Sequence, residues 1–219
     1  LHALDFTLGG RTDRIAARDL RSGNSATFNS ANARAGLRYQ PVEAILIRSS
    51  YGTGFRAPTL GNLYGGSGWG YYSTVDPLHF TSGAEIPVLT SANSNLDPER
   101  SRSLSVGTVI TIPAVKGLSL SVDYYHTKLT GTIANAASFY LKQNALDQGS
   151  SFVPGDPSTI NPDAVFSDRI FRYSDGSIDY LDVTSMNLDR TVSDGLDLEL
   201  HYRGTQTSLG RFSHTLAAH

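Results

Sequence analysis

Apolar and polar residues alternate along much of this chain with a period of two. The alternation is clearest over residues 118–125, where one face would carry Leu118, Leu120, Val122 and Tyr124. Residues 196–202 repeat it, with leucines on one face and Asp197, Glu199 and His201 on the other. A period of two predicts β-strands with one apolar face.

The same pattern predicts about seven strands, near residues 1–8, 34–39, 44–55, 103–111, 118–133, 179–202 and 212–219. Their connections alternate in length, with long ones at residues 14–30, 61–98 and 134–177 and short ones at 40–43, 113–117 and 204–209. An Asp-Gly pair is a favoured hairpin turn, but a hairpin at Asp194-Gly195 would break this order. We therefore predict one long strand there, bulged near residues 193–195.

The strand over residues 44–55 leads into the long connection at residues 61–98. Gly52 and Gly54 weaken the strand, and Pro58 ends it because proline has no N–H to give to a ladder. Ala57 precedes a proline and is therefore pushed to an extended conformation, so we predict that no helix starts here. In the connection over residues 134–177, helical spacing indicates a short helix through Ala137, Tyr140, Leu141 and Ala145.

Strand length and connection length together favour a membrane β-barrel. Strands of about nine residues or more can cross a bilayer when tilted, and long connections are ordinary at the outer rim of such barrels. No run of about 18 apolar residues occurs, so no transmembrane helix is expected. We predict an all-β fold, an antiparallel transmembrane β-barrel, with two long extracellular loops at residues 56–100 and 134–177.

Seven strands are too few to close a transporter-sized barrel, which needs about 22. Residues 1–219 are therefore expected to be part of a single barrel domain whose remaining strands are missing from this sequence. The pattern also begins and ends within a strand, which is typical of an internal fragment. An open sheet with two unpaired edges should not be stable alone in water.

Composition excludes several classes of function. The 219 residues have a formal net charge of −2 and no Lys/Arg cluster, so nucleic acid is not an expected partner. Cysteine is absent, which excludes disulfides and cysteine-based metal sites. The six histidines (2, 79, 126, 201, 214 and 219) are scattered without ligand spacing, so no metal or cofactor is predicted.

Three features of the sequence resemble cofactor-binding or catalytic sites, but none of them supports that function. Gly52-x-Gly54-x-x-Ala57 matches a dinucleotide fingerprint, but that motif must open a helix within a βαβ unit, and none is expected here. Gly65–Trp69 lacks the second glycine of a nucleophile elbow. The carboxylates Asp123, Asp197 and Glu199 are better explained as the polar interior of a barrel. We predict no catalytic residue and no enzyme.

An aromatic cluster in the first long loop is the candidate binding feature. It comprises Tyr64, Trp69, Tyr71 and Tyr72 in a glycine-rich segment. Aromatic side chains offer rigid contact area with polar tips, as binding surfaces often do. Packing within the loop, or a girdle at the membrane interface, remains the alternative. We expect Tyr39, Tyr124, Tyr125 and Tyr202 to be girdle residues.

Four motifs in order resemble the barrel signature of TonB-dependent outer-membrane receptors. The first follows Arg48-Ser49-Ser50-Tyr51 and comprises Gly54, Phe55, Arg56, Ala57, Pro58, Thr59 and Leu60. The second is Asn95–Ser101, with Pro98 and Glu99 at its centre, although the family usually has lysine at the position of Asp97. Leu120–Tyr125 resembles the next strand. Asn187 and then Ser193–Leu200, with Gly195 and Asp197, resemble the strand that returns after the second loop.

This resemblance implies energy-coupled uptake, across the outer membrane of a Gram-negative bacterium, of a scarce bulky nutrient. Ferric siderophores, corrinoids and oligosaccharides are the expected substrate classes. It also implies an N-terminal plug, absent from this sequence, through which a TonB energy-coupling complex acts, and contact with outer-membrane lipid. A passive porin-like or adhesin barrel and a soluble β-rich carbohydrate-binding module remain alternatives.

Overall fold

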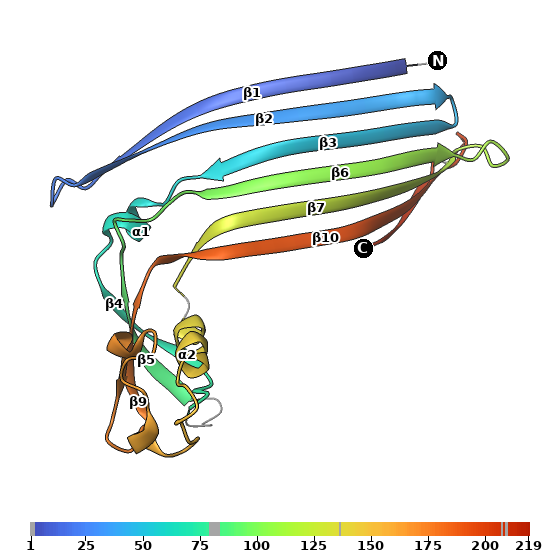
Figure 1. The fold of residues 1–219 in the computed structure, drawn as a ribbon. Helices are drawn as coiled ribbons and strands as arrows, with labels where there is room; N and C mark the ends of the chain where they lie inside the picture. Colours follow the sequence, from blue (N-terminus) through green and yellow to red (C-terminus); the bar gives the residue numbers. More distant parts are fainter. Residues whose placement is uncertain (1–2, 79–83, 136, 207, 209) are drawn as a thin grey trace.

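Seven antiparallel strands lie side by side in one long curved sheet (Figure 1). The computed structural model describes residues 3–78, 84–135, 137–206, 208 and 210–219. In spatial order the strands are β1 (Ala3–Arg18), β2 (Ser25–Val42), β3 (Ile45–Arg56), β6 (Glu99–Thr111), β7 (Leu118–Ala134), β10 (Met186–Arg203) and β11 (Ser213–Ala218). This sheet, here called the wall sheet, confirms the predicted all-β fold and its seven antiparallel strands.

One face of the wall sheet, the apolar face, exposes large hydrophobic side chains on all seven strands. They are Leu4, Phe6, Leu8, Leu37, Ile47, Tyr51, Leu104, Val106, Ile110, Tyr124, Leu196, Leu198, Leu200, Tyr202 and Leu216. Soluble monomers rarely expose a contiguous apolar patch larger than a few hundred Å². A surface of this extent requires an apolar environment.

The opposite face, the polar face, carries charged side chains that pair across the strands. Arg38 lies opposite Asp5, with 3.1 Å between Nη1 and Oδ2. Arg48 on β3 reaches over β6 to Asp123 on β7, with Nε 2.8 Å from Oδ1. The β6 residue between them is Gly107, where a Cβ atom would overlap the Asp123 carboxylate. The absence of a side chain at residue 107 thus permits an ion pair that spans three strands.

Strands β1 and β2 are longer than predicted. The first strand is predicted to span about residues 1–8, before Gly9 and Gly10, and residues 14–30 are predicted to form a long connection. Instead both glycines pair in the ladder, opposite Arg34 and Ala33, and only residues 19–24 form the turn. The Asp19 carboxylate closes this turn by accepting hydrogen bonds from the N–H groups of residues 21 and 22. The hydrogen bonds between β1 and β2 therefore outweigh the low strand preference of the polar and glycine residues in this segment.

A short helix, α1 (Leu60–Tyr64), begins directly after Pro58, where no helix was predicted. The restriction imposed by a proline applies to the residue before it, and Ala57 precedes the helix. Thr59 forms a capping box with Asn62. Its Oγ1 accepts the Asn62 N–H, and Asn62 Oδ1 accepts the Thr59 N–H at 3.1 Å. These caps satisfy the free N–H groups of the first turn.

The two longest connections contain more regular structure than predicted. The first contributes β4 (Gly68–Thr74) and β5 (Ala84–Ser91). The second contributes α2 (Ala137–Leu146), β8 (Ile170–Arg172), β9 (Ile178–Thr184) and the 3₁₀ helices η1 (Pro157–Thr159) and η2 (Ser167–Arg169). Helix α2 confirms the helical spacing seen in the sequence. Together these elements form a second sheet with the order β4-β5-β9-β8, which lies beyond one end of the wall sheet (Figure 1).

The predicted long strand over residues 179–202 is two strands. Strand β9 belongs to the second sheet, β10 belongs to the wall sheet, and the chain changes sheets at Ser185. Ser185 is buried, its N–H donates to the Ser91 carbonyl at 3.0 Å, and its Oγ donates to Asn135 Oδ1 at 2.7 Å. Hydrogen bonds from Ser185 to Ser91 and Asn135 thus hold the chain where it passes from β9 to β10, and no turn residues mark this point in the sequence.

Within β10 the chain passes Asp194 and Gly195 without a hairpin, as predicted. The predicted bulge near residues 193–195 is wrong, because the register with β7 runs unbroken from Met186 to Tyr202. A register shift occurs instead between Tyr39 and Val42, so the predicted turn at residues 40–43 is displaced to residues 43–44. Among the described residues, no helix is long and apolar enough to cross a membrane.

Candidate ligand-binding site

The second sheet and its helices, here called the loop module (residues 68–78, 84–91 and 137–184), form one body from two connections. Strand β5 of the first pairs in parallel with β9 of the second, with Val88 opposite Leu181. Both side chains are almost fully buried, at 1% and 0% exposure. They pack in a core with Ile86, Ala137, Tyr140, Leu141, Ile170 and Val183. The two connections therefore share one core.

A buried ion pair also joins the two connections. Arg172 Nη2 lies 3.1 Å from Asp76 Oδ1, and Nη1 pairs with the other carboxylate oxygen while donating to the Gly176 carbonyl at 2.8 Å. The two side chains are only 10% and 3% exposed. A buried carboxylate requires such a partner, because an unpaired charge in this environment is strongly destabilising.

Asn187 joins the end of the wall sheet to the segment through which the first connection returns to it. Its Nδ2 donates to the carbonyls of Asp97 and Gly131, and its Oδ1 accepts the Asp97 N–H, each at 2.8 Å. The amide thus connects β10 to the end of β7 and to the segment that precedes β6. Asn93 adds a second link, since Nδ2 donates to the Ser185 carbonyl at 2.9 Å.

Arg56 and Glu99 join the strand ends that flank the first connection. The guanidinium donates to both oxygens of the Glu99 carboxylate, which is almost fully buried. Glu99 Oε1 also accepts the Ile133 N–H at 2.8 Å. This arrangement fixes the ends of β3, β6 and β7 together. Pro58, two residues after Arg56, is buried and Ala57 is half-buried, while Pro98 directly precedes Glu99.

The other signature residues lie within the wall sheet. Gly54 faces Ser101, whose Oγ occupies the space of a Cβ atom, and the Tyr125 ring lies within 2.7 Å of where a Gly195 Cβ would be. Asp197 lies opposite Asp123 and contacts His219 at 3.0 Å. Phe55 stands opposite Arg100 on β6. These positions build the wall sheet, and none of them reaches the loop module.

The four candidate aromatic residues do not form one cluster. Trp69 and Tyr71 share one face of β4 and are 64% and 71% exposed. Tyr72 stands on the opposite face, which is also the face that carries Ile86, and is 44% exposed. Tyr64 ends helix α1 and packs against a separate core beneath the loop module, formed by Ala17, Leu63 and Leu96. Only Trp69 and Tyr71 are therefore brought together on one surface.

Two aromatic residues that the sequence did not single out join that surface. Phe171 on β8 stacks on Tyr180 of β9, with ring centroids 4.2 Å apart. Trp69 meets Tyr180 edge to face at 5.5 Å. The three rings form a ridge across the outer face of the second sheet, built from both connections. No pattern in the sequence indicated this, because β4 and β9 are far apart along the chain.

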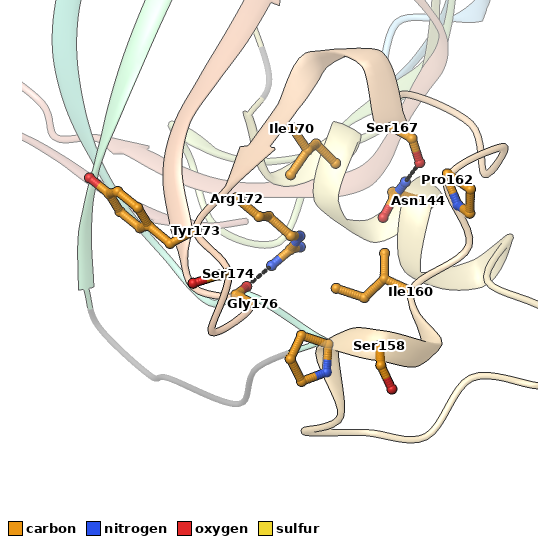
Figure 2. Close-up of a pocket in the computed structure, with 11 residues that line it drawn as sticks. Asn144, Ser158, Ile160, Pro162, Ser167, Ile170, Arg172, Tyr173, Ser174 and Gly176 are labelled. Atoms are coloured by element: carbon orange, nitrogen blue, oxygen red, sulfur yellow. Dashed lines mark hydrogen bonds between the residues drawn. The ribbon is translucent and has the colours of Figure 1, made fainter.

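A cavity of about 500 Å³ opens on the other side of β8, within the second connection (Figure 2). Its lining is mixed, with Ile160, Pro162 and Ile170 beside Ser158, Ser174 and Tyr173. Arg172 and Asn144 border it, but their polar groups are engaged, and Asn144 Nδ2 donates to the Val165 carbonyl at 2.9 Å. The cavity can accept a neutral, partly polar group.

Two tyrosines of the loop module have perturbed ionisation. Burial raises the pKa of Tyr140, whose hydroxyl donates to the Thr184 carbonyl at 3.3 Å. A hydrogen bond with Asp179 raises the pKa of the exposed Tyr173. Both therefore stay protonated at neutral pH and act as hydrogen-bond donors.

Nothing in the described part of the chain gathers three metal-ligating side chains of the His, Cys, Asp or Glu types. His126 pairs with Asp194 and His219 with Asp197, while His2 and His79 lie outside the described residues. Of the carboxylates considered for acid–base work, Asp123 is bound by Arg48. Within the described residues the arrangement offers surfaces for binding.

Comparison with known proteins agrees with this architecture. A family model described as TonB dependent receptor-like, beta-barrel matches residues 1–218. No curated protein sequence matches the chain.

Solved structures of similar fold include three receptors or transporters. One is the FrpB iron transporter of Neisseria meningitidis (F5-1 variant), with 16% identity and a TM-score of 0.52, where the match covers 93% of this chain and 22% of that one. Another is the ferric enterobactin receptor PfeA of Pseudomonas aeruginosa, a Q482A mutant in complex with enterobactin, with 14% identity, a TM-score of 0.54, and coverage of 99% of this chain and 24% of that one. The third is the siderophore receptor PirA of Acinetobacter baumannii, with 11% identity, a TM-score of 0.53, and coverage of 99% of this chain and 25% of that one.

At these identities the structural likeness concerns the fold, and the chain spans only 22% to 25% of the length of those three proteins. The family match is different in kind, since it covers almost the whole chain. It also agrees with the four signature motifs and with the amphipathic wall sheet. This chain therefore belongs to the TonB-dependent receptor-like β-barrel family.

Proposed function

We propose that this chain is part of the barrel wall of an outer-membrane receptor that takes up a scarce, bulky nutrient by energy-coupled transport in a Gram-negative bacterium. The observation that carries this proposal is the wall sheet itself. Its apolar face is exposed on all seven strands, its polar face carries paired charges, and its strands end at a module built from both long connections. Lipid covers the apolar face, and the polar face lines the lumen.

The whole receptor would combine residues 1–219 with further strands of the same barrel domain and with an N-terminal plug that fills the lumen. The TonB energy-coupling complex acts through that plug. Because the similar receptors are about four times longer than this chain, these parts come from the rest of the polypeptide. Residues 56–100 and 134–177 then lie on the extracellular side.

Ferric siderophores are the substrate class that we propose first, with corrinoids and oligosaccharides as the other members of the same functional class. Support comes from the similar structures, of which one is described as a siderophore receptor, one as a ferric enterobactin receptor and one as an iron transporter. The receptor performs no catalysis and holds no resident metal or cofactor. A ferric ion enters only as part of the transported chelate.

We assign ligand contact to the exposed aromatic side chains of the loop module. Trp69 and Tyr71 stand on the ridge face, Tyr72 on the opposite face, and Tyr64 supports the base of the module. Aromatic residues of this kind often dominate binding energy. The size and exposure of the ridge suit a ligand with rings or flat apolar surfaces.

Uptake of radioiron from a panel of ferric siderophores tests the proposal, in a deletion strain that carries the full-length receptor gene. The Trp69→Ala/Tyr71→Ala/Tyr72→Ala receptor should bind its siderophore at least about tenfold more weakly, since aromatic hot spots each contribute about 2 kcal/mol. A control with Tyr51, Tyr124 and Tyr202 changed to alanine removes three tyrosines from the apolar face and should keep its affinity. Unchanged uptake in the first variant removes the ligand assignment.

A further inference from the structure

A cluster of cations occupies the apolar face of the wall sheet at the end nearest the long connections. It consists of Arg100 and Arg102 on β6, Lys128 on β7 and Arg190 on β10, here called the basic patch. The strand period places Arg102 on the same face as Leu104, and Lys128 on the same face as Tyr124. Two residues along a strand span about 7 Å, so the patch begins directly beyond the apolar surface.

The register concentrates this positive charge. Arg102 stands directly opposite Lys128, and Arg100 and Arg190 flank Thr130 from its two sides. Like charges directly opposite each other in a sheet are destabilising. The sequence has placed four cations within three adjacent strands, where they repel one another unless an anion lies between them.

No anion of the described chain neutralises the basic patch. None of its four side chains forms an ion pair or side-chain hydrogen bond within the described residues, and the three arginines are exposed. On the β3 side, Thr53 and Phe55 stand opposite Arg102 and Arg100. The nearest carboxylate on this face in the described part, Asp194, is engaged with His126 at 3.3 Å.

We propose that the basic patch binds the phosphate groups of a polyphosphorylated lipid in the extracellular leaflet. This rests on the proposed membrane location of the wall sheet. A lipid that packs its acyl chains on the apolar face would present its headgroup at the level of the patch, and arginine pairs with phosphate through two parallel hydrogen bonds. Four positive charges exceed what one phosphodiester can neutralise, which selects a headgroup with two phosphates over a monoanionic phospholipid.

The test uses the full-length receptor, purified in detergent and delipidated, with diphosphoryl lipid A as the probe and phosphatidylglycerol as the comparison lipid. Native mass spectrometry measures retention of each lipid. We expect preferential retention of lipid A, reduced at least about tenfold when Arg100, Arg102, Lys128 and Arg190 are all changed to glutamine, because each basic residue near a charged lipid surface contributes about 1 kcal/mol.

The matched control changes Arg21, Arg34, Arg203 and Arg211 to glutamine, which removes the same charge from exposed positions outside the basic patch. It should retain lipid A as the unmodified receptor does. Three results would each overturn the proposal: equal loss in both variants, equal retention of phosphatidylglycerol, or saturation of the patch by inorganic phosphate with no preference for lipid A.

Membrane fractionation and siderophore uptake, measured on the same variants, separate this inference from the proposed function. A receptor that resides in the outer membrane and transports, but shows no preference for lipid A, contradicts the basic patch alone. A receptor that does not fractionate with the outer membrane contradicts both. Heat-modified migration of the barrel in gels shows that the patch variant has folded.

Discussion

The wall sheet and the loop module are stabilised in opposite ways. In the wall sheet the large hydrophobic residues remain open to the surroundings, and Leu8 and Leu216 are 70% and 72% exposed. In the loop module a set of aliphatic side chains turns inward to form a core, and Leu181 is completely buried. In the proposed membrane location the wall sheet depends on surrounding lipid and on further barrel strands, whereas the loop module contains its own core.

This difference indicates which changes each region should tolerate. If the apolar face of the wall sheet meets fluid lipid, as proposed, the lipid adapts to the shape of a substituted side chain. A substitution in the core of the loop module leaves a cavity or an unpaired charge that packed neighbours cannot fill. Paired changes, one in each region, test whether the distinction holds.

The largest effect should follow from Arg172→Gln, which leaves the Asp76 carboxylate buried without its partner. We expect the loop module to lose about 3–5 kcal/mol of stability against local opening. Hydrogen exchange of residues 84–91 and 178–184 in the full-length receptor measures this loss of stability. The control Arg169→Gln breaks a more exposed pair with Asp182 and should cost about 1 kcal/mol or less. Equal exchange in the two variants would contradict the role of the buried pair.

Leu181→Ala should come next, with a loss of about 2–5 kcal/mol in the loop module through the cavity that it creates. Leu200→Ala removes the same atoms from the apolar face of the wall sheet and should leave exchange in the loop module unchanged. If the two variants change hydrogen exchange in the loop module equally, the distinction between the two regions is contradicted. Both are read by the same exchange experiment, with β5 and β9 as reporters.

A smaller effect is expected within the wall sheet from Gly107→Ala. The added methyl displaces the Asp123 carboxylate from Arg48, at a cost of about 1–3 kcal/mol, as for other overpacked sites. Gly36→Ala is the control, since its nearest neighbours lie 3.8 Å or more from the new atom. The denaturant concentration at which the receptor unfolds in micelles should be lower for Gly107→Ala and unchanged for Gly36→Ala.

The smallest effect concerns pH. Hydrogen bonds from the Ser158 side chain and N–H lower the pKa of Asp156 below its usual 3.8. Because the folded pKa lies below the unfolded value, the contribution is present above pH 3.8 and is lost as the pH falls through the folded pKa. Exchange around η1 should rise in that range, and Asp156→Ala should abolish the change. Asp163→Ala, which removes a nearby carboxylate, should leave the pH response intact.

Local patterning was sufficient to predict most of the wall sheet and too little to predict the loop module. Residues 118–124 alternate strictly, so the first half of strand β7 follows from the sequence alone. The pairing of Val88 with Leu181 joins residues 93 positions apart, and no local signal encodes it. For the same reason Phe171 and Tyr180 were missed, since each becomes notable only when its strand meets the other.

The errors within the wall sheet have the same origin. Gly9 and Gly10 look like a strand end locally, yet β2 holds them in the ladder. The break at Ser185 was missed although the phase of the alternation changes across it, from Leu181 and Val183 to Met186 and Leu188, where the chain passes from one sheet to the other. The signature residues were predicted as a group from the family resemblance, but the reason for Asn187, a single amide that links three segments, appears only in the structure.

The central claim, that one face of the wall sheet meets lipid and the other meets the lumen, can be measured directly with single cysteines, since residues 1–219 contain none. Single cysteines replace Ser119, Leu120, Ser121 and Val122 in the full-length receptor, in intact outer membranes. The account predicts alternation along β7, with residues 119 and 121 labelled by a water-soluble maleimide and residues 120 and 122 only by a lipid-soluble one. Equal labelling of all four by the water-soluble reagent would contradict it.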